Sequence, residues 1–164
     1  MINQELKEQY KKLNQEKLNE QFIDACQNND LDIVKYLLTS AELKKHANIH
    51  EEKDLGFRWA CEKGHLEVVK YLLASDELTE HADIHSRNDL GFIWACRCGH
   101  LEVIKYLIID MSIDKTTYIE KYLTEKKDNK TAQQATELFN TRDLYQKLKE
   151  NIKDNKEKVK KMKI

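Results

Sequence analysis

The clearest hydrophobic pattern of the chain lies in residues 55–73, where apolar side chains return at helical spacing between charged ones. Two apolar groups flank Gly64, and glycine commonly ends helices because it adopts the left-handed backbone conformation without strain. The pattern predicts two short antiparallel helices. Their buried faces would carry Phe57, Ala60 and Cys61 in the first helix and Val68, Val69, Leu72 and Leu73 in the second.

This pattern returns almost unchanged 35 residues later, over residues 90–108, and in a looser form 35 residues earlier, over residues 22–38. A fixed period of this length indicates stacked repeats, each of which buries its apolar face against its neighbours. We therefore expect an all-α solenoid of stacked antiparallel helix pairs, with about three repeats over residues 20–110.

The segments on either side of the repeats are expected to close the two ends of the stack. Residues 1–19 carry apolar side chains at helical spacing and predict an N-terminal capping helix. Residues 111–146 predict a degenerate repeat that forms a C-terminal cap. Residues 147–164 hold eight lysines against three acidic residues and predict a polar tail that frays.

Polar residues before the apolar runs suggest where individual helices begin. Asp54 and Asp89 stand directly before the first helices of two repeats, and both are good N-cap residues. Two serines predict N-caps of an extra turn after the second helices. Beyond the repeats, three further helix starts are predicted at polar residues. The two serines are Ser40 and Ser75, and the three later helix starts are Asp114, Asp128 and Thr141.

Composition narrows the class of protein. The 164 residues include no proline and four glycines, which disfavours hairpins and long β-sheets. A formal net charge of −1 selects neither nucleic acid nor an anionic membrane. No apolar run approaches the roughly 20 residues of a membrane span, and the N-terminus lacks a secretory signal. A cytoplasmic protein without a membrane partner is expected.

Three of the four cysteines, Cys26, Cys61 and Cys96, occupy the same position of successive repeats. Equivalent positions on stacked helices lie roughly 8–10 Å apart, whereas a disulfide needs Cα atoms within about 7 Å. These cysteines are therefore expected to be buried free thiols, and a reducing compartment fits them.

The sequence Gly-His-Leu-Glu-Val-Val-Lys-Tyr-Leu-Leu, with Ala-Cys before it and His-Ala-Asp-Ile-His after it, resembles the ankyrin repeat over residues 20–110. Two features depart from that family. Its Thr-Pro-Leu-His is replaced by Leu55-Gly56-Phe57-Arg58 and Leu90-Gly91-Phe92-Ile93, and the period is 35 instead of 33. Short turns are therefore expected in place of the family's β-hairpin. The variant resembles ankyrin proteins of intracellular bacteria and large viruses, some of which act inside a host cell.

The resemblance implies a protein–protein interaction module whose first helices line a concave binding face. Trp59 and Trp94 would be two rungs of an aromatic ladder on that face, or would simply pack between repeats; both alternatives stay open. Trp and Arg are enriched among binding hot spots. The predicted contact residues vary between repeats: Asp24 and Gln27, then Arg58, Trp59, Glu62 and Lys63, then Ile93, Trp94, Arg97 and Cys98.

The sequence signals for metal binding, catalysis and nucleic-acid binding are weaker than the signal for protein binding. The pairs His46/His50 and His81/His85 have a spacing that suits a metal on one continuous helix, but they align with the links between repeats, so structural roles are favoured. No phosphate-binding loop or catalytic signature is present, and neither a cofactor nor enzymatic activity is expected. A monomer is expected. The alternative function is binding of nucleic acid or another anionic surface through the lysine-rich tail.

Overall fold

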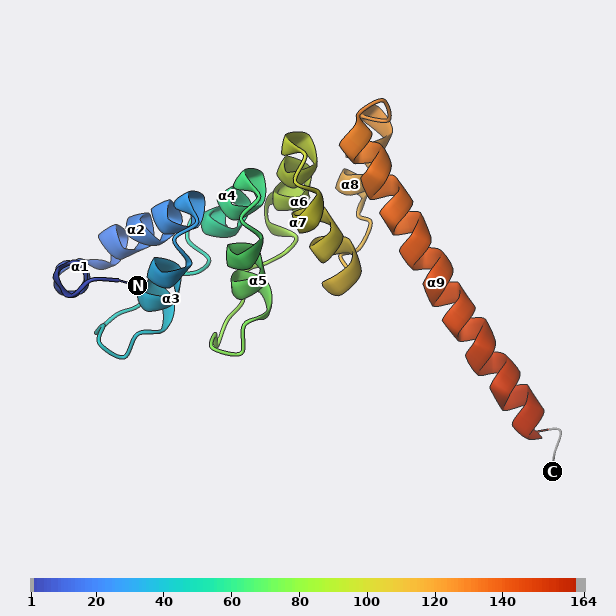
Figure 1. Ribbon diagram of the computed structural model, residues 1–164, viewed down its shortest axis with the longest axis horizontal. Helices are drawn as coiled ribbons and strands as arrows, with labels where there is room; N and C mark the ends of the chain where they lie inside the picture. Colours follow the sequence, from blue (N-terminus) through green and yellow to red (C-terminus); the bar gives the residue numbers. More distant parts are fainter. Residues whose placement is uncertain (1, 162–164) are drawn as a thin grey trace.

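The computed structural model describes residues 2–161, and within this range the chain forms helices and no strand (Figure 1). Three helix pairs follow one another along the stack, with one short helix before them and two helices after them. The helices are α1 (Gln4–Tyr10), α2 (Gln15–Asn28), α3 (Leu31–Thr39), α4 (Leu55–Lys63), α5 (Leu66–Ala74), α6 (Ser86–Cys98), α7 (Leu101–Lys105) with its π-helical continuation η1 (Tyr106–Asp110), α8 (Thr117–Glu125) and α9 (Lys130–Lys161).

The all-α repeat architecture predicted from the 35-residue period is confirmed. The pairs α2–α3, α4–α5 and α6–α7 turn at Asn29, Gly64 and Gly99, which all have positive φ. The first helices α2, α4 and α6 stack into one layer and the second helices into another (Figure 1). Contact is much more extensive between successive first helices than between second ones. The solenoid therefore curves with its first helices on the concave side.

The first helices approach closely because glycine faces phenylalanine at their contacts. A Cβ on Gly91 would lie 2.8 Å from Cε1 of Phe57, and a Cβ on Gly56 would lie 2.9 Å from Cε1 of Phe22. Both phenylalanine rings are buried. Any larger residue at either glycine would force these rings out of a close-packed core.

The links between repeats consist of hydrogen-bonded turns over residues 40–54 and 75–89, the second of which includes the first residues of α6. Ser40 and Ser75 each accept a hydrogen bond from a backbone N–H two residues later, which forms a turn and not a further turn of helix. The second half of each link contains three consecutive residues, 52–54 and 87–89, with φ between 47° and 63°. Each triplet forms one left-handed turn, a backbone conformation that residues other than glycine rarely adopt.

Asp54 stands at the predicted N-cap position of α4 but makes no capping hydrogen bond, and Asp89 lies within the bounds of α6; both residues belong to these left-handed turns. Asp54 is buried and accepts hydrogen bonds from His50 Nδ1 (2.8 Å) and from the backbone N–H of Asp83 in the next link (3.0 Å). Asp89 accepts from His85 Nδ1 (2.6 Å) and from Thr116 Oγ1.

The same pair of positions in the first repeat holds Gln15 and Asn19. Gln15 Nε2 donates to Asn19 Oδ1 (3.0 Å), and Asn19 Oδ1 accepts from the backbone N–H of Asn48 (2.9 Å). Buried side-chain oxygens of Asn19 and Asp54 therefore accept from backbone N–H groups 35 residues apart, one in each link. The buried residues Asn19, Asp54 and Asp89 are called the polar ladder below.

The two ends of the stack are covered by helices. Tyr10 of α1 is buried, and its ring centroid lies 6.0 Å from that of Tyr36. At the far end, Phe139 of α9 packs against Phe92 with ring centroids 5.8 Å apart. Arg142 donates to the carbonyl oxygen of Ile113 (2.7 Å) and so fixes α9 beside η1.

The predicted helix starts beyond residue 110 need correction. Thr116, and not Asp114, caps α8 by accepting from the N–H of Ile119. Asn129, and not Asp128, accepts from the N–H groups of the first turn of α9. No helix starts at Thr141, whose hydroxyl donates to the carbonyl of Glu137 inside α9. The lysine-rich tail predicted from residue 147 begins inside α9, which continues as one helix to Lys161, and residues 162–164 of that tail lie outside the described part of the chain.

Candidate functional site

Trp59 of α4 and Trp94 of α6 lie next to each other on the layer of first helices. Their ring centroids are 5.7 Å apart with an interplanar angle of 44°, and both side chains are half-buried. Each tryptophan precedes the Ala-Cys pair of its repeat, so the 35-residue period brings the two rings together. The two rings therefore pack against each other between repeats and stay partly exposed.

Cationic side chains border this tryptophan pair. Lys63 Nζ lies 5.4 Å from the ring centroid of Trp59, within the range of a cation–π interaction. Lys63 is exposed and lies one helical turn after Trp59 on α4. The pair therefore presents aromatic edges and a positive charge at the same place.

Arg58 differs from the other predicted contact residues because it is buried, with 4% of its surface exposed. Its guanidinium lies 5.7 Å from the Trp94 ring and donates to the carbonyl oxygens of Lys53 (3.1 Å) and Glu52 (2.7 Å). Burial lowers the pKa of the guanidinium from its usual value. The expectation of Arg58 as an accessible contact is corrected: this residue fixes the left-handed turn before α4.

The remaining predicted contact residues lie at the surface of the three first helices. Four are exposed, namely Asp24, Lys63, Arg97 and Cys98, and three are half-buried, namely Gln27, Glu62 and Ile93. The backbone carbonyls of Gln27 and Glu62 accept hydrogen bonds from His65 (2.9 Å) and His100 (2.7 Å) of the following repeat. Together with the two tryptophans they form the first-helix surface, a name kept below for these nine residues.

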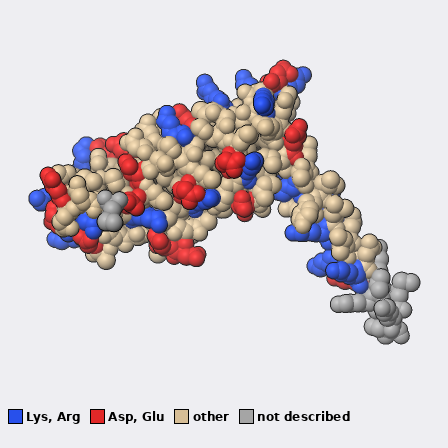
Figure 2. Space-filling model, viewed as in Figure 1, with Lys and Arg blue, Asp and Glu red and all other residues tan. Residues whose placement is uncertain are grey.

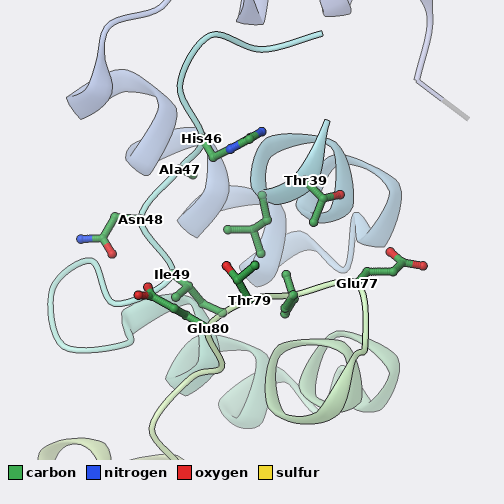
Figure 3. Close-up of a pocket in the computed structure, with 10 residues that line it drawn as sticks. Thr39, His46, Ala47, Asn48, Ile49, Glu77, Thr79 and Glu80 are labelled. Carbon is green, nitrogen blue, oxygen red and sulfur yellow. The ribbon is translucent and has the colours of Figure 1, made fainter. Parts of the chain in front are cut away.

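A groove of about 360 Å³ separates the two links and was not identified from the sequence (Figure 3). Its wall combines apolar side chains, such as Ile49 and Leu78, with the carboxylates of Glu77 and Glu80. The groove arises where two links lie side by side, so only the stacking of repeats reveals it. The lining residues are Leu38, Thr39, His46, Ala47, Asn48, Ile49, Glu77, Leu78, Thr79 and Glu80.

The histidines of the two HxxxH pairs point to separate partners. His46 Nε2 lies 3.0 Å from the carbonyl oxygen of Ser40, whereas His50 Nδ1 binds the carboxylate of Asp54. His81 and His85 repeat this arrangement in the second link. Over the described part of the chain, no group of three or more His, Cys, Asp or Glu side chains could hold a metal ion. None of the described helices combines the length and hydrophobicity that a membrane crossing requires.

The stacked helix pairs with a half-exposed aromatic pair define a helical-repeat binding scaffold. A family model of ankyrin repeats matches residues 22–119 in three copies, and the chain belongs to the ankyrin-repeat family. Ankyrin repeats are generally protein–protein interaction modules, and the family is typically non-enzymatic. Searches of the curated proteins and of the solved structures find no match to this chain.

Proposed function

We propose that the chain binds a partner protein through its first-helix surface. The observation that carries this proposal is the contact between Trp59 and Trp94, which joins two large aromatic side chains on one accessible face. Aromatic anchors lose little conformational entropy on binding, and they dominate the energetics of many interfaces. Neighbouring contacts already orient both rings, so the partner meets a preformed surface.

Charges around the tryptophans would select the partner. Asp24 and Glu62 supply negative charge, whereas Lys63 and Arg97 supply positive charge. The groove between the links adds the carboxylates of Glu77 and Glu80. The partner is therefore a protein with a central apolar or aromatic residue and charges of both signs around it.

The proposed setting is a cytosol, either that of the cell that makes the chain or that of a host cell. The free thiols support this setting, because Cys98 is exposed and would be prone to oxidation outside a reducing compartment. A non-enzymatic role agrees with the His65 and His100 rings, which are held by backbone carbonyls of the preceding repeat.

The test is affinity capture with the intact protein, followed by titration of the captured partner against variants. Trp59→Ala and Trp94→Ala should each weaken binding by roughly 2 kcal/mol while the helical circular dichroism signal is retained. Tyr118→Ala removes an exposed aromatic residue of α8 and serves as the matched control. Lys63→Glu with Arg97→Glu tests the same surface without changing a buried side chain, because both residues are exposed. Unchanged affinity in both the tryptophan and charge variants would refute the proposal.

A further inference from the structure

The C-terminal half of α9 extends away from the solenoid. Ala132, Ala135 and Phe139 are buried against the preceding helices, and Arg142 makes hydrogen bonds to the carbonyl oxygens of Ile108 and Ile113. From Leu144 to Glu157 every residue is exposed, and Figure 1 shows this part of α9 projecting beyond the stack. We call residues 144–157 the arm.

Four large apolar side chains of the arm are exposed. Leu144, Tyr145, Leu148 and Ile152 have exposed fractions of 60%, 61%, 49% and 55%. At about 100° per residue these four positions fall within an arc of about 100° around the helix axis. The arm thus carries a continuous apolar stripe that no other described part of the chain covers.

Three of the four lysines of the arm flank this stripe, whereas Lys153 lies away from it. By the same helical geometry, Lys149 and Lys156 lie just beyond one edge of the stripe and Lys147 beyond the other. Lys149 Nζ lies 4.8 Å from the ring centroid of Tyr145, within the range of a cation–π interaction. The acidic residues Glu150, Asp154 and Glu157 lie on the opposite side of the helix.

We propose that the arm binds the surface of membranes that contain anionic lipids. An apolar stripe between lysines is the pattern of a helix that lies in a membrane interface, where the stripe enters the acyl region and the lysines reach the headgroups. On the face shown in Figure 2, the charged side chains along the arm are mostly basic. The first-helix surface takes no part in this contact.

Other occupants fit the arm less well. Nucleic acid would engage the lysines but would leave Leu148 and Ile152 exposed to water. A second copy packed along the stripe would cover its apolar side chains but would bring the lysines at the edges of both stripes into one contact. The lipid surface satisfies the stripe and the lysines at once.

The experiment measures cosedimentation of the full-length protein with vesicles of phosphatidylcholine, with and without phosphatidylserine. The protein should bind only the vesicles that contain phosphatidylserine, and added salt should weaken this binding. The double variants Leu148→Ser/Ile152→Ser and Lys149→Glu/Lys156→Glu should each bind at least about tenfold more weakly. All four substituted residues are exposed, so the solenoid remains folded.

Matched controls change the same chemistry outside the arm. Ile109→Ser/Tyr118→Ser removes two exposed apolar side chains, and Lys44→Glu/Lys45→Glu reverses two exposed lysines; both should retain binding. Three results would overturn the proposal. They are absence of binding to phosphatidylserine vesicles, binding that survives loss of Leu148 and Ile152, and a dimer of the protein that the Leu148→Ser/Ile152→Ser variant dissociates.

Discussion

Gly64 lies so close to His100 that a Cβ built on the glycine would stand 2.4 Å from His100 Nδ1. Gly64 ends α4 with a φ of 76°, and the His100 ring makes its other contact at the same helix end, where Nε2 lies 2.7 Å from the carbonyl oxygen of Glu62. The last carbonyls of a helix lack partners within the helix. His100 therefore supplies a hydrogen-bond partner at the C-terminal end of α4 and links two repeats.

Comparison of two glycines tests this contact. Gly64 and Gly99 both have positive φ, so alanine at either should lose about 1 kcal/mol or more through backbone strain. At Gly99 the nearest atom to an added Cβ is Thr131 Oγ1, at 3.8 Å, which is ordinary contact. Gly64→Ala should cost at least about 1 kcal/mol more than Gly99→Ala, because it also displaces the His100 ring. Urea denaturation measures both; equal losses would contradict the role given to His100.

Two substitutions of Asp54, a residue of the polar ladder, should lower the free energy of unfolding by different amounts. Asp54→Ala should lower the free energy of unfolding by about 1–3 kcal/mol, because the N–H of Asp83 and His50 Nδ1 would lose their acceptor. Asp54→Asn should cost less, since Asn19 makes the equivalent bond to the N–H of Asn48 in the first repeat. Asp76→Ala, at an exposed link position, is the control. Similar losses for the Ala and Asn variants would show that the acceptor oxygen is unimportant.

Thiol reactivity should distinguish Cys98 from the other three cysteines. Burial raises the pKa of the Cys26 and Cys61 thiols and raises that of Cys96 to about 12, so all three stay protonated and inaccessible at neutral pH. Cys98 is exposed. A thiol reagent should modify one cysteine rapidly in the native protein and the other three only in denaturant. Cys98→Ser should abolish the rapid phase, and a second rapidly modified thiol would contradict the burial of the core cysteines.

Most of the repeat core could be predicted from the sequence. Phe57, Ala60, Cys61 and Val68 were assigned to buried faces, and each is fully buried or nearly so. The variation between copies also indicated where the surface lies, since Lys63 and Arg97 are exposed. These predictions succeeded because burial of apolar side chains follows a local helical period.

The errors concern polar residues at the links. Arg58 varies between repeats like a surface residue, yet it is buried on the carbonyls of a left-handed turn. Asp54 looked like an N-cap, yet its backbone has a φ of 57° and its carboxylate holds the next link. In both cases the side chain is buried on a backbone group whose position depends on an unusual turn. No local sequence pattern predicts that turn.

The sequence by itself determined the 35-residue period, the helix pairs and the composition of the stacked core, because those features depend on residue spacing within one repeat. Only the tertiary structure decided which polar side chains became buried, how the tryptophans meet and where a groove opens between the links. It also showed that α9 leaves the stack after Arg142 with an uncovered apolar stripe. These outcomes depend on contacts between repeats, which the spacing within one repeat does not specify.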